Sequence, residues 1–199
     1  RWKYMRQHVK SFIAHCPFCQ KMRDIKTVIQ THPFTTAAYK PMDRINVDTI
    51  GPLPLDENGN AFIIVFIDCF SRFCELYPVH TTDASTCARC LLNFAGRYGV
   101  PRFILSDRGS QFANEIIEGV NRLMSSCHVF SMAYSKEENA IVERANAEVM
   151  RHLRAIVFDT KLKKQWSTSL PLVQRIMNCT SKDSIGVSPT QIIFGNSID

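Results

Sequence analysis

The run AFIIVFI, residues 61–67, is apolar at every position. A strand with one solvated face alternates apolar and polar side chains, whereas a strand covered on both faces need not. The run therefore predicts a central strand, and the Asn-Gly pair just before it is typical of a tight turn. An earlier strand is predicted at Ile45–Thr49, where the side chains alternate until a Gly-Pro pair, and another after Ser71.

The remaining chain mixes helix and strand patterns. Apolar residues at helical spacing from Val142 to Ile156 predict one helix, and Asn139 has the position of its N-cap. Further helices are expected over 2–13, 84–100, 114–127 and 166–180 and within 186–195, with further strands over 102–107 and 128–134. Strands come first, strands and helices then alternate, and helices finish the chain. This order indicates an α/β layer with a mixed sheet.

Composition limits the classes of protein. The 199 residues suffice for one α/β core and a small appendage, and the apolar fraction of 45% is that of a globular protein. No apolar run reaches the roughly 18 residues of a membrane span, so no membrane partner is expected. Nothing at the start resembles a signal peptide, so we expect reduced cysteines. The first residue is Arg rather than Met, and we expect a piece of a longer protein.

The positive charge is concentrated near the start. Residues 1–40 contain eight Lys and Arg against a single Asp, whereas the rest of the chain contains 16 basic and 17 acidic side chains. A basic arm beside a nearly neutral body suggests a polyanionic partner such as nucleic acid. The alternative is a solvated surface that keeps the chain soluble.

Three acidic residues stand out by their positions. Asp48 interrupts the alternation of the first strand, Asp107 ends the strand of ILSDRGSQF, and Glu143 is placed by the pattern in the first turn of its helix. Neighbouring parallel strands end side by side, and a helix packed against them can present a residue to the same rim. Three carboxylates there would repel one another unless hard divalent cations lay between them.

Each acidic residue also has a structural interpretation. An Asp at a strand end is often a turn or cap residue, and a Glu in the first turn of a helix interacts favourably with the helix dipole. Asp68 also follows an apolar run, yet bulky residues continue after it, and we interpret it as structural. Lys161, Lys163 and Lys164 are interpreted as a solvated turn.

Six stretches in order make the chain resemble the integrases of retroviral and gypsy-like LTR-retrotransposon type. They are INVDTIGPLP, FIDCFSRF, ILSDRGSQF, AYSKEENAIVERAN, HLR and SPTQIIFG, and they run from about residue 44 to residue 199. The spacing agrees with the Asp, Asp, Glu triad of that family, because 35 residues separate Asp107 from Glu143. The resemblance implies an RNase H-like fold, a five-stranded mixed sheet flanked by helices.

The resemblance also implies a function. It is that of a polynucleotidyl transferase that processes DNA 3′ ends and joins them to target DNA, with Asp48, Asp107 and Glu143 as catalytic ligands of two Mg²⁺ or Mn²⁺ ions. DNA and other copies of the chain are the implied partners, without a small-molecule substrate. The implied location is the host nucleus, or a virus-like particle before integration. The DNA-contact candidates are Arg108, Gln111, Lys136, Arg144, Asn146 and Arg151. The alternative for the basic candidates is a solvated surface without DNA contact. The alternative for Gln111 is a polar residue at the start of a helix.

The sequence departs from the family pattern near the catalytic helix. Ala140 stands where the family usually has Gly, and Ser135 and Lys136 replace a His-Pro-like pair. Because Ala tolerates positive φ poorly, we expect a stiffer or differently shaped loop. Ala147 and Met150 occupy positions that are basic in retroviral relatives, so DNA contact from this helix is expected to be rearranged or weakened.

The pair Cys16 and Cys19, in HCPFCQK, has the spacing of half a tetrahedral zinc site. The resemblance implies the end of a His-His-Cys-Cys zinc domain whose histidines precede Arg1, because neither His8 nor His15 has a partner at ligand spacing. Zn²⁺ is thus expected in the parent protein. The implied domains are a zinc-domain remnant over 1–23, a linker over 24–43 and the catalytic core over 44–199. The other six cysteines are predicted to be core thiols.

Two alternatives to an active integrase remain open. One is a domesticated or decayed integrase that binds DNA or a protein without joining DNA, and the departures at Ala140, Ala147 and Met150 motivate it. The other is a different RNase H-like nuclease or a cut-and-paste transposase, against which the 35-residue spacing and the cysteine pair argue.

Overall fold

The computed structural model of the chain describes residues 2–15, 38, 40–130, 136–160, 164–181 and 186–195. The chain divides into two units, residues 1–35 and 36–199. In the first, α1 (Met5–His15) begins three residues later than predicted, and Trp2 precedes it. Val9 and Phe12, members of its predicted apolar stripe, are exposed. The cysteine pair and most of the predicted linker lie outside the described residues, so the zinc remnant stays a prediction.

The second unit is built on one five-stranded sheet. Its strands are β1 (Arg44–Ile50), β2 (Phe62–Asp68), β3 (Cys74–Val79), β4 (Phe103–Ser106) and β5 (Cys127–Phe130). They lie in the order β3-β2-β1-β4-β5. The pairs β1–β2 and β2–β3 are antiparallel, while β1–β4 and β4–β5 are parallel. The predicted mixed sheet is therefore confirmed.

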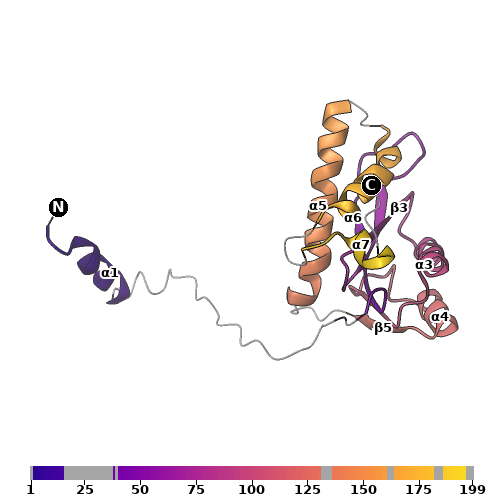
Figure 1. Ribbon diagram of the computed structural model, residues 1–199, viewed down its shortest axis with the longest axis horizontal. Coiled ribbons are helices and arrows are strands. Elements are labelled where there is room, and N and C mark those ends of the chain that lie inside the picture. Colours follow the sequence, from indigo (N-terminus) through magenta and orange to yellow (C-terminus); the bar gives the residue numbers. More distant parts are fainter. Residues whose placement is uncertain are drawn as a thin grey trace. The chain divides into compact units, whose positions relative to one another are not determined.

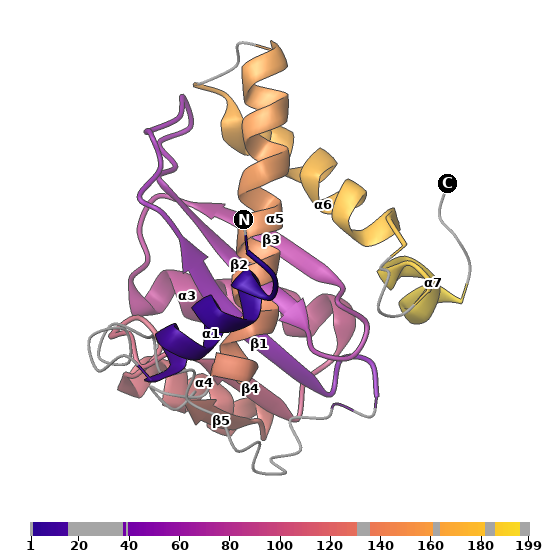
Figure 2. The ribbon, with the colours of Figure 1, turned by 90° about the vertical axis from the view of Figure 1, so that its left-hand side faces the viewer.

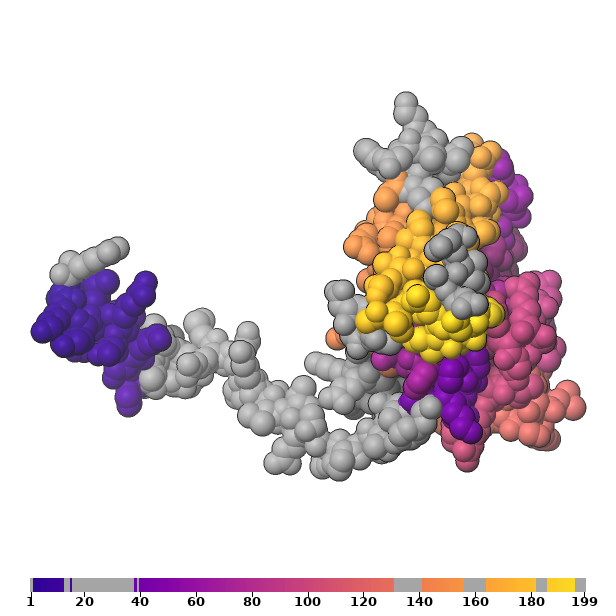
Figure 3. All heavy atoms as spheres, in the orientation of Figure 1, coloured from indigo at the N-terminus to yellow at the C-terminus, as the bar shows by residue number. Residues whose placement is uncertain are grey.

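Helices cover both faces of the sheet. They are α3 (Ala84–Tyr98), α4 (Glu115–Met124), α5 (Lys136–Thr160), the 3₁₀ turn η1 (Trp166–Ser169), α6 (Leu170–Cys179) and α7 (Pro189–Phe194). Figures 1 and 2 show α5 and α6 on one face of the sheet and α3 and α4 on the other. In Figure 3 the yellow side chains of α6 and α7 lie directly against one another. None of the described helices is long and apolar enough to cross a membrane.

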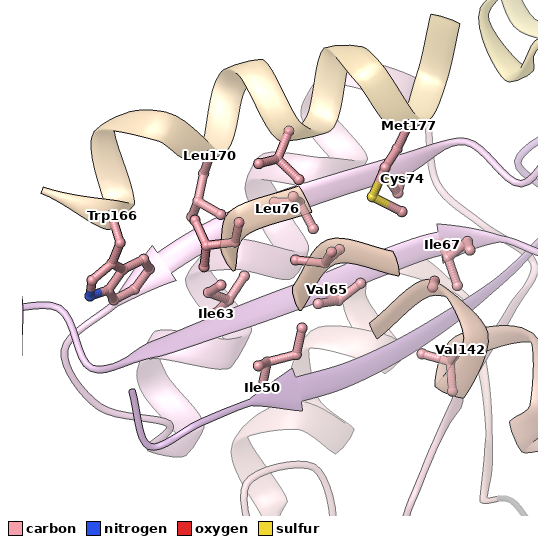
Figure 4. Packing of buried hydrophobic residues seen from close by; sticks show 14 residues of the cluster. Ile50, Ile63, Val65, Ile67, Cys74, Leu76, Val142, Trp166, Leu170 and Met177 are labelled. Carbon is pink, nitrogen blue, oxygen red and sulfur yellow. The ribbon is translucent and has the colours of Figure 1, made fainter. Parts of the chain in front are cut away.

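The apolar run that predicted a central strand explains the two-sided packing. Successive side chains of a strand point to opposite faces, so Ile63, Val65 and Ile67 pack toward α5 and α6, whereas Ile64 and Phe66 pack toward α3 and α4. Figure 4 shows the first of these clusters, in which Trp166, Leu170 and Met177 lie over side chains of the sheet; the labelled sheet residues are Ile50, Ile63, Val65, Ile67, Cys74 and Leu76. The five apolar residues of β2 from Ile63 to Ile67 are almost fully buried.

Local sequence sets most element ends. β1 stops at Gly51, whose φ of +140° and close approach to Phe62 exclude a side chain, since an added Cβ would lie 2.5 Å from the Phe62 ring. Asp83, Asn114 and Ser188 are N-caps whose side chains accept a backbone N–H from α3, α4 and α7, respectively.

Predictions for Asn139, Cys127 and Cys179 were wrong, and that for Asp68 was confirmed. Asn139 is not an N-cap: α5 begins at Lys136, because Lys-Glu-Glu are good helix formers and extend the helix toward its start. Cys127 is not a core thiol but is exposed, since it begins an edge strand, and Cys179 is only half-buried. Asp68 is structural as predicted, because its buried carboxylate accepts N–H groups from Met42 and Ser71.

Candidate active site

Asp48 lies inside β1, two residues before the strand ends, with Val65 of β2 as its antiparallel partner. Its half-buried carboxylate accepts the Thr49 N–H at Oδ1 over 2.8 Å and the Asn146 side-chain amide at Oδ2 over 2.7 Å. Asn146 belongs to α5, so this second bond ties the central strand to the helix packed on it. Asn146 was predicted as a DNA contact; its side-chain amide instead donates to the Asp48 carboxylate.

Asp107 follows directly after the last residue of β4, which runs parallel to β1. The side chain is exposed, and its Oδ1 accepts the Gly109 N–H over 3.0 Å. This short loop bond orients the carboxylate locally. Gln111 folds back over Gly109, where an added Cβ would lie 2.4 Å from its amide nitrogen. Gln111 therefore packs on the loop that carries Asp107.

Glu143 is an exposed residue of α5 between buried Val142 and Ala145, which face the sheet. The predicted position in the first turn was wrong, because the helix starts seven residues before Glu143. Ala140, at the position where the family usually has Gly, is also helical. The position of Glu143 beside the sheet thus comes from the packing of α5 rather than from a helix start.

The structure brings the three predicted carboxylates to one pocket. This pocket has a volume of about 220 Å³ and is lined by Asp48, Asp107 and Glu143 together with neighbouring residues that include Ser106 and Val142. Burial raises the pKa of Asp48, the N–H groups of Thr49 and Asn146 lower it, and the charges of Asp107 and Glu143 raise it further. The three charges are therefore close enough to repel. Within the described ranges, these carboxylates share the pocket without being gathered into a ready-made metal site, so a bound ion would have to draw them closer together.

The other DNA-contact candidates are spread over neighbouring surfaces. The guanidinium of Arg108 lies over the ring of Phe130, 5.8 Å from its centroid. Arg144 lines a second pocket, of about 230 Å³, together with Arg72 and Glu148. Arg151 is exposed and lies 3.8 Å from the Glu148 carboxylate, a separation at which a surface pair contributes little. Lys136 belongs to α5, but its side chain lies outside the described part of the structure.

Sequence reasoning missed one pair beside the pocket. The Ser106 hydroxyl lies 2.8 Å from Nε2 of His128 in β5 and donates to the Asp107 carbonyl over 2.8 Å. Burial lowers the pKa of His128, while the Glu118 carboxylate raises it. A histidine within an otherwise apolar strand was the available signal, but nothing in the sequence gives the register that sets it beside Ser106.

Comparisons with known proteins give the family of the chain. Residues 38–136 match the family described as "Integrase core domain". The chain is 26% identical over 197 residues to the retrovirus-related Pol polyprotein from transposon 412 of Drosophila melanogaster, covering 98% of this chain and 16% of that polyprotein. The chain thus spans about a sixth of the length of this relative.

Solved structures share the fold. The HTLV-2 integrase catalytic core domain in complex with magnesium superimposes with a TM-score of 0.67 at 15% identity, over 79% of this chain and 99% of that one. A chain of the simian T-cell lymphotropic virus intasome, solved with PP2A regulatory subunit B56 gamma, gives a TM-score of 0.76 at 16% identity, over 97% of this chain and 68% of that one. With its core-domain match and its Pol polyprotein relatives, the chain belongs to the integrases of retroviral and LTR-retrotransposon type.

Proposed function

We propose that this chain contains the catalytic core of a metal-dependent polynucleotidyl transferase, which processes DNA 3′ ends and joins them to target DNA by transesterification. One observation carries the proposal. In a member of the integrase family, Asp48, Asp107 and Glu143 come from β1, from the end of β4 and from α5 to line a single pocket.

The donor set of the pocket fits a hard divalent cation. Carboxylate oxygens are the ligands that Mg²⁺ and Mn²⁺ prefer, and the repulsion that helps to raise the pKa of Asp48 would be relieved by positive charge. Asp48, Asp107 and Glu143 are the residues that would hold the ions. Bound there, two ions would supply activation of the attacking oxygen and stabilisation of the leaving oxygen in a displacement at phosphorus.

The chain itself contributes orientation. The Asn146 amide and the Thr49 N–H hold the Asp48 carboxylate, and the Gly109 N–H holds that of Asp107. Both carboxylates are thereby oriented before any substrate arrives, which lowers the cost of reorganisation during the reaction. The exposed side chain of Glu143 completes the set from the helix side.

DNA and further copies of the chain are the proposed partners. Arg108, Arg144 and Arg151 are the described basic candidates for phosphate contacts, which fix the register of DNA without reading its sequence. A magnesium-bound integrase core described as trimeric and an intasome are among the similar structures, which supports divalent metal, assembly and DNA as partners. We further propose action in the host nucleus or a virus-like particle, and zinc binding through Cys16 and Cys19 in the parent protein.

The test is strand joining with Mg²⁺ or Mn²⁺, using an oligonucleotide that carries an element end together with a target duplex. Asp48→Asn and Glu143→Gln should each reduce joining by on the order of 10²–10³-fold, the usual cost of losing one preorganised charge at the reacting centre. Glu115→Gln, which changes an exposed carboxylate of α4, is the matched control and should leave joining unchanged.

Three results would contradict this proposal. Equal joining by the wild-type chain and Glu143→Gln would refute the assignment of the site, and DNA binding without any joining would favour a domesticated integrase. Helical Ala140 is the observation that keeps this second candidate in view. Hydrolysis of DNA without a joined product would instead indicate a nuclease.

A further inference from the structure

The carbonyl of Asp107 is held by a side chain rather than by the sheet. The last paired residues of the β4–β5 ladder are Ser106 and Phe130, so Asp107 lies just beyond it. A backbone group at the end of a ladder needs another partner. The buried Ser106 side chain supplies it, because its hydroxyl donates to the Asp107 carbonyl over 2.8 Å.

His128 determines which way the Ser106 hydroxyl points. A serine hydroxyl has one proton to donate, and here that proton goes to the Asp107 carbonyl. Toward His128 Nε2, 2.8 Å away, the Ser106 oxygen must therefore accept, so Nε2 carries the ring proton. The bonds form a chain from the His128 ring through the Ser106 hydroxyl to the backbone of Asp107.

The surroundings of the ring offer no other hydrogen-bond partner among the described residues. Nδ1 of His128 is buried and has no hydrogen-bond partner in the described part of the chain. His128 lines a cavity of about 10 Å³ whose other lining residues are apolar except for Cys87, with Val47, Phe66 and Phe112 among them. Nδ1 therefore lacks a partner in either neutral tautomer, and the Ser106 bonds distinguish the two. With the proton on Nε2, the ring donates to the Ser106 oxygen while the Ser106 proton goes to the Asp107 carbonyl; with the proton on Nδ1, that single hydroxyl proton could serve only one of these two acceptors.

A second contact from β5 holds the other side of Asp107. Phe130 lies two residues after His128, and their rings pack at 4.4 Å between centroids. The guanidinium of Arg108 lies over the Phe130 ring. His128 thus anchors the residue before Asp107, and Phe130 anchors the residue after it. The edge strand β5 holds the tripeptide 106–108 from both ends.

We propose that His128 is a positioning residue, which acts through the Ser106 hydroxyl to hold the backbone of Asp107 and so to place its carboxylate in the pocket. This inference rests on the proposed function, in which Asp107 is a metal ligand. Neither His128 nor Ser106 touches the metal or DNA in this scheme. Their substitution changes how well Asp107 is placed, not which groups the pocket contains.

The experiment is a titration of the full 199-residue chain with Mn²⁺ alone, followed by electron paramagnetic resonance or calorimetry, without DNA. His128→Phe keeps a ring against Phe130 but removes the donor, whereas His128→Gln keeps an N–H donor and removes the ring. We expect His128→Phe and Ser106→Ala each to weaken Mn²⁺ binding by about 10-fold or more, as is usual for residues that orient a metal ligand. His128→Gln should restore most of the affinity.

The controls separate an effect on Mn²⁺ affinity from an effect on the stability of the fold. Because both residues act in one chain, the double variant His128→Phe with Ser106→Ala should bind Mn²⁺ no more weakly than the weaker single variant. Val129→Ala, on the same strand, should lower the unfolding midpoint without changing Mn²⁺ affinity. If His128→Phe does not fold, the Mn²⁺ affinity of Ser106→Ala decides the test.

Two outcomes contradict the proposal, and they differ. Wild-type affinity in both His128→Phe and Ser106→Ala, together with weakened binding in Asp107→Asn, would overturn the positioning role alone. Wild-type affinity in Asp107→Asn would overturn the metal assignment, and the positioning role with it.

Discussion

At the residue scale, the charge of Asp48 favours metal binding but opposes folding. Burial and two neighbouring carboxylates raise its pKa, so its charged form is less favourable in the folded chain than in the unfolded one. The N–H groups of Thr49 and Asn146 offset only part of this. Such opposition between stability and site chemistry is common where a protein binds a charged ligand. It indicates a carboxylate kept for binding rather than for folding.

The cysteines give a residue-scale prediction. Burial raises the pKa of Cys87 to about 12 and that of Cys90 to about 11, so both remain protonated thiols at pH 8. Only the thiolate reacts with maleimide, and at pH 8 a thiol with a pKa near 11 is roughly 0.1% thiolate. In the folded chain, exposed Cys127 should react on the order of 10² times faster than Cys90, and faster still relative to Cys87. Peptide mass spectrometry of chain labelled for increasing times measures this.

The pH dependence of maleimide labelling is a further check on the burial of these thiols. Raising the pH toward 11 increases the thiolate fraction of Cys90 first and that of Cys87 later, so labelling of the folded chain should spread in that order. Unfolding in guanidinium should remove the difference from Cys127 at pH 8. Comparable labelling of all three in the folded chain at pH 8 would show that the thiols of α3 are not buried as described.

At the element scale, the sequence was informative wherever local chemistry decides. The apolar run of β2, the Gly-Pro end of β1 and the helical pattern after residue 114 correspond to observed elements because each depends on neighbouring residues. The start of α5 was misplaced because a polar stretch was interpreted as a loop although its residues favour a helix. The contact between Ser106 and His128 could not be predicted, since it depends on the parallel register of β4 and β5.

The edge strand β3 gives an element-scale prediction. Asn178 of α6 accepts the Cys74 N–H and donates to the Cys74 carbonyl, each over 2.8 Å, and so satisfies the open side of the sheet. Asn178→Ala would remove both of these buried hydrogen bonds to the backbone of Cys74. Because the loss of such a bond to a buried group costs about 1–3 kcal/mol, we expect the free energy of unfolding to fall by about 2–6 kcal/mol.

The matched control is Thr180→Ala, just beyond the end of the same helix, where an exposed hydroxyl donates to the Ile176 carbonyl. Its effect should stay within about 0.5 kcal/mol, as for most surface substitutions. Urea unfolding followed by circular dichroism compares the two. Similar losses of stability in both variants would show that Asn178 does not protect the sheet edge.

At the scale of the whole molecule, folding and charge are separated along the chain. Among the described residues, both hydrophobic clusters draw their members from positions 42–177, within the unit 36–199. Seven Lys and Arg lie in residues 1–35 against one Asp. The first unit therefore adds positive charge to the chain, while its described residues, 2–15, belong to neither cluster. Cutting between the units should affect DNA binding and stability differently.

A chain of residues 36–199 tests this separation. Its free energy of unfolding should match that of the full chain within about 0.5 kcal/mol, because both hydrophobic clusters that the structure describes are kept whole. Its affinity for duplex DNA should fall, and the slope of log affinity against log salt should flatten by about 0.9 for each phosphate that the shorter chain no longer neutralises. Changing Lys3, Arg6 and Lys10 together to Gln in the full chain should flatten the slope in the same way without altering stability, and an unchanged slope in both would place the phosphate-binding residues on the second unit.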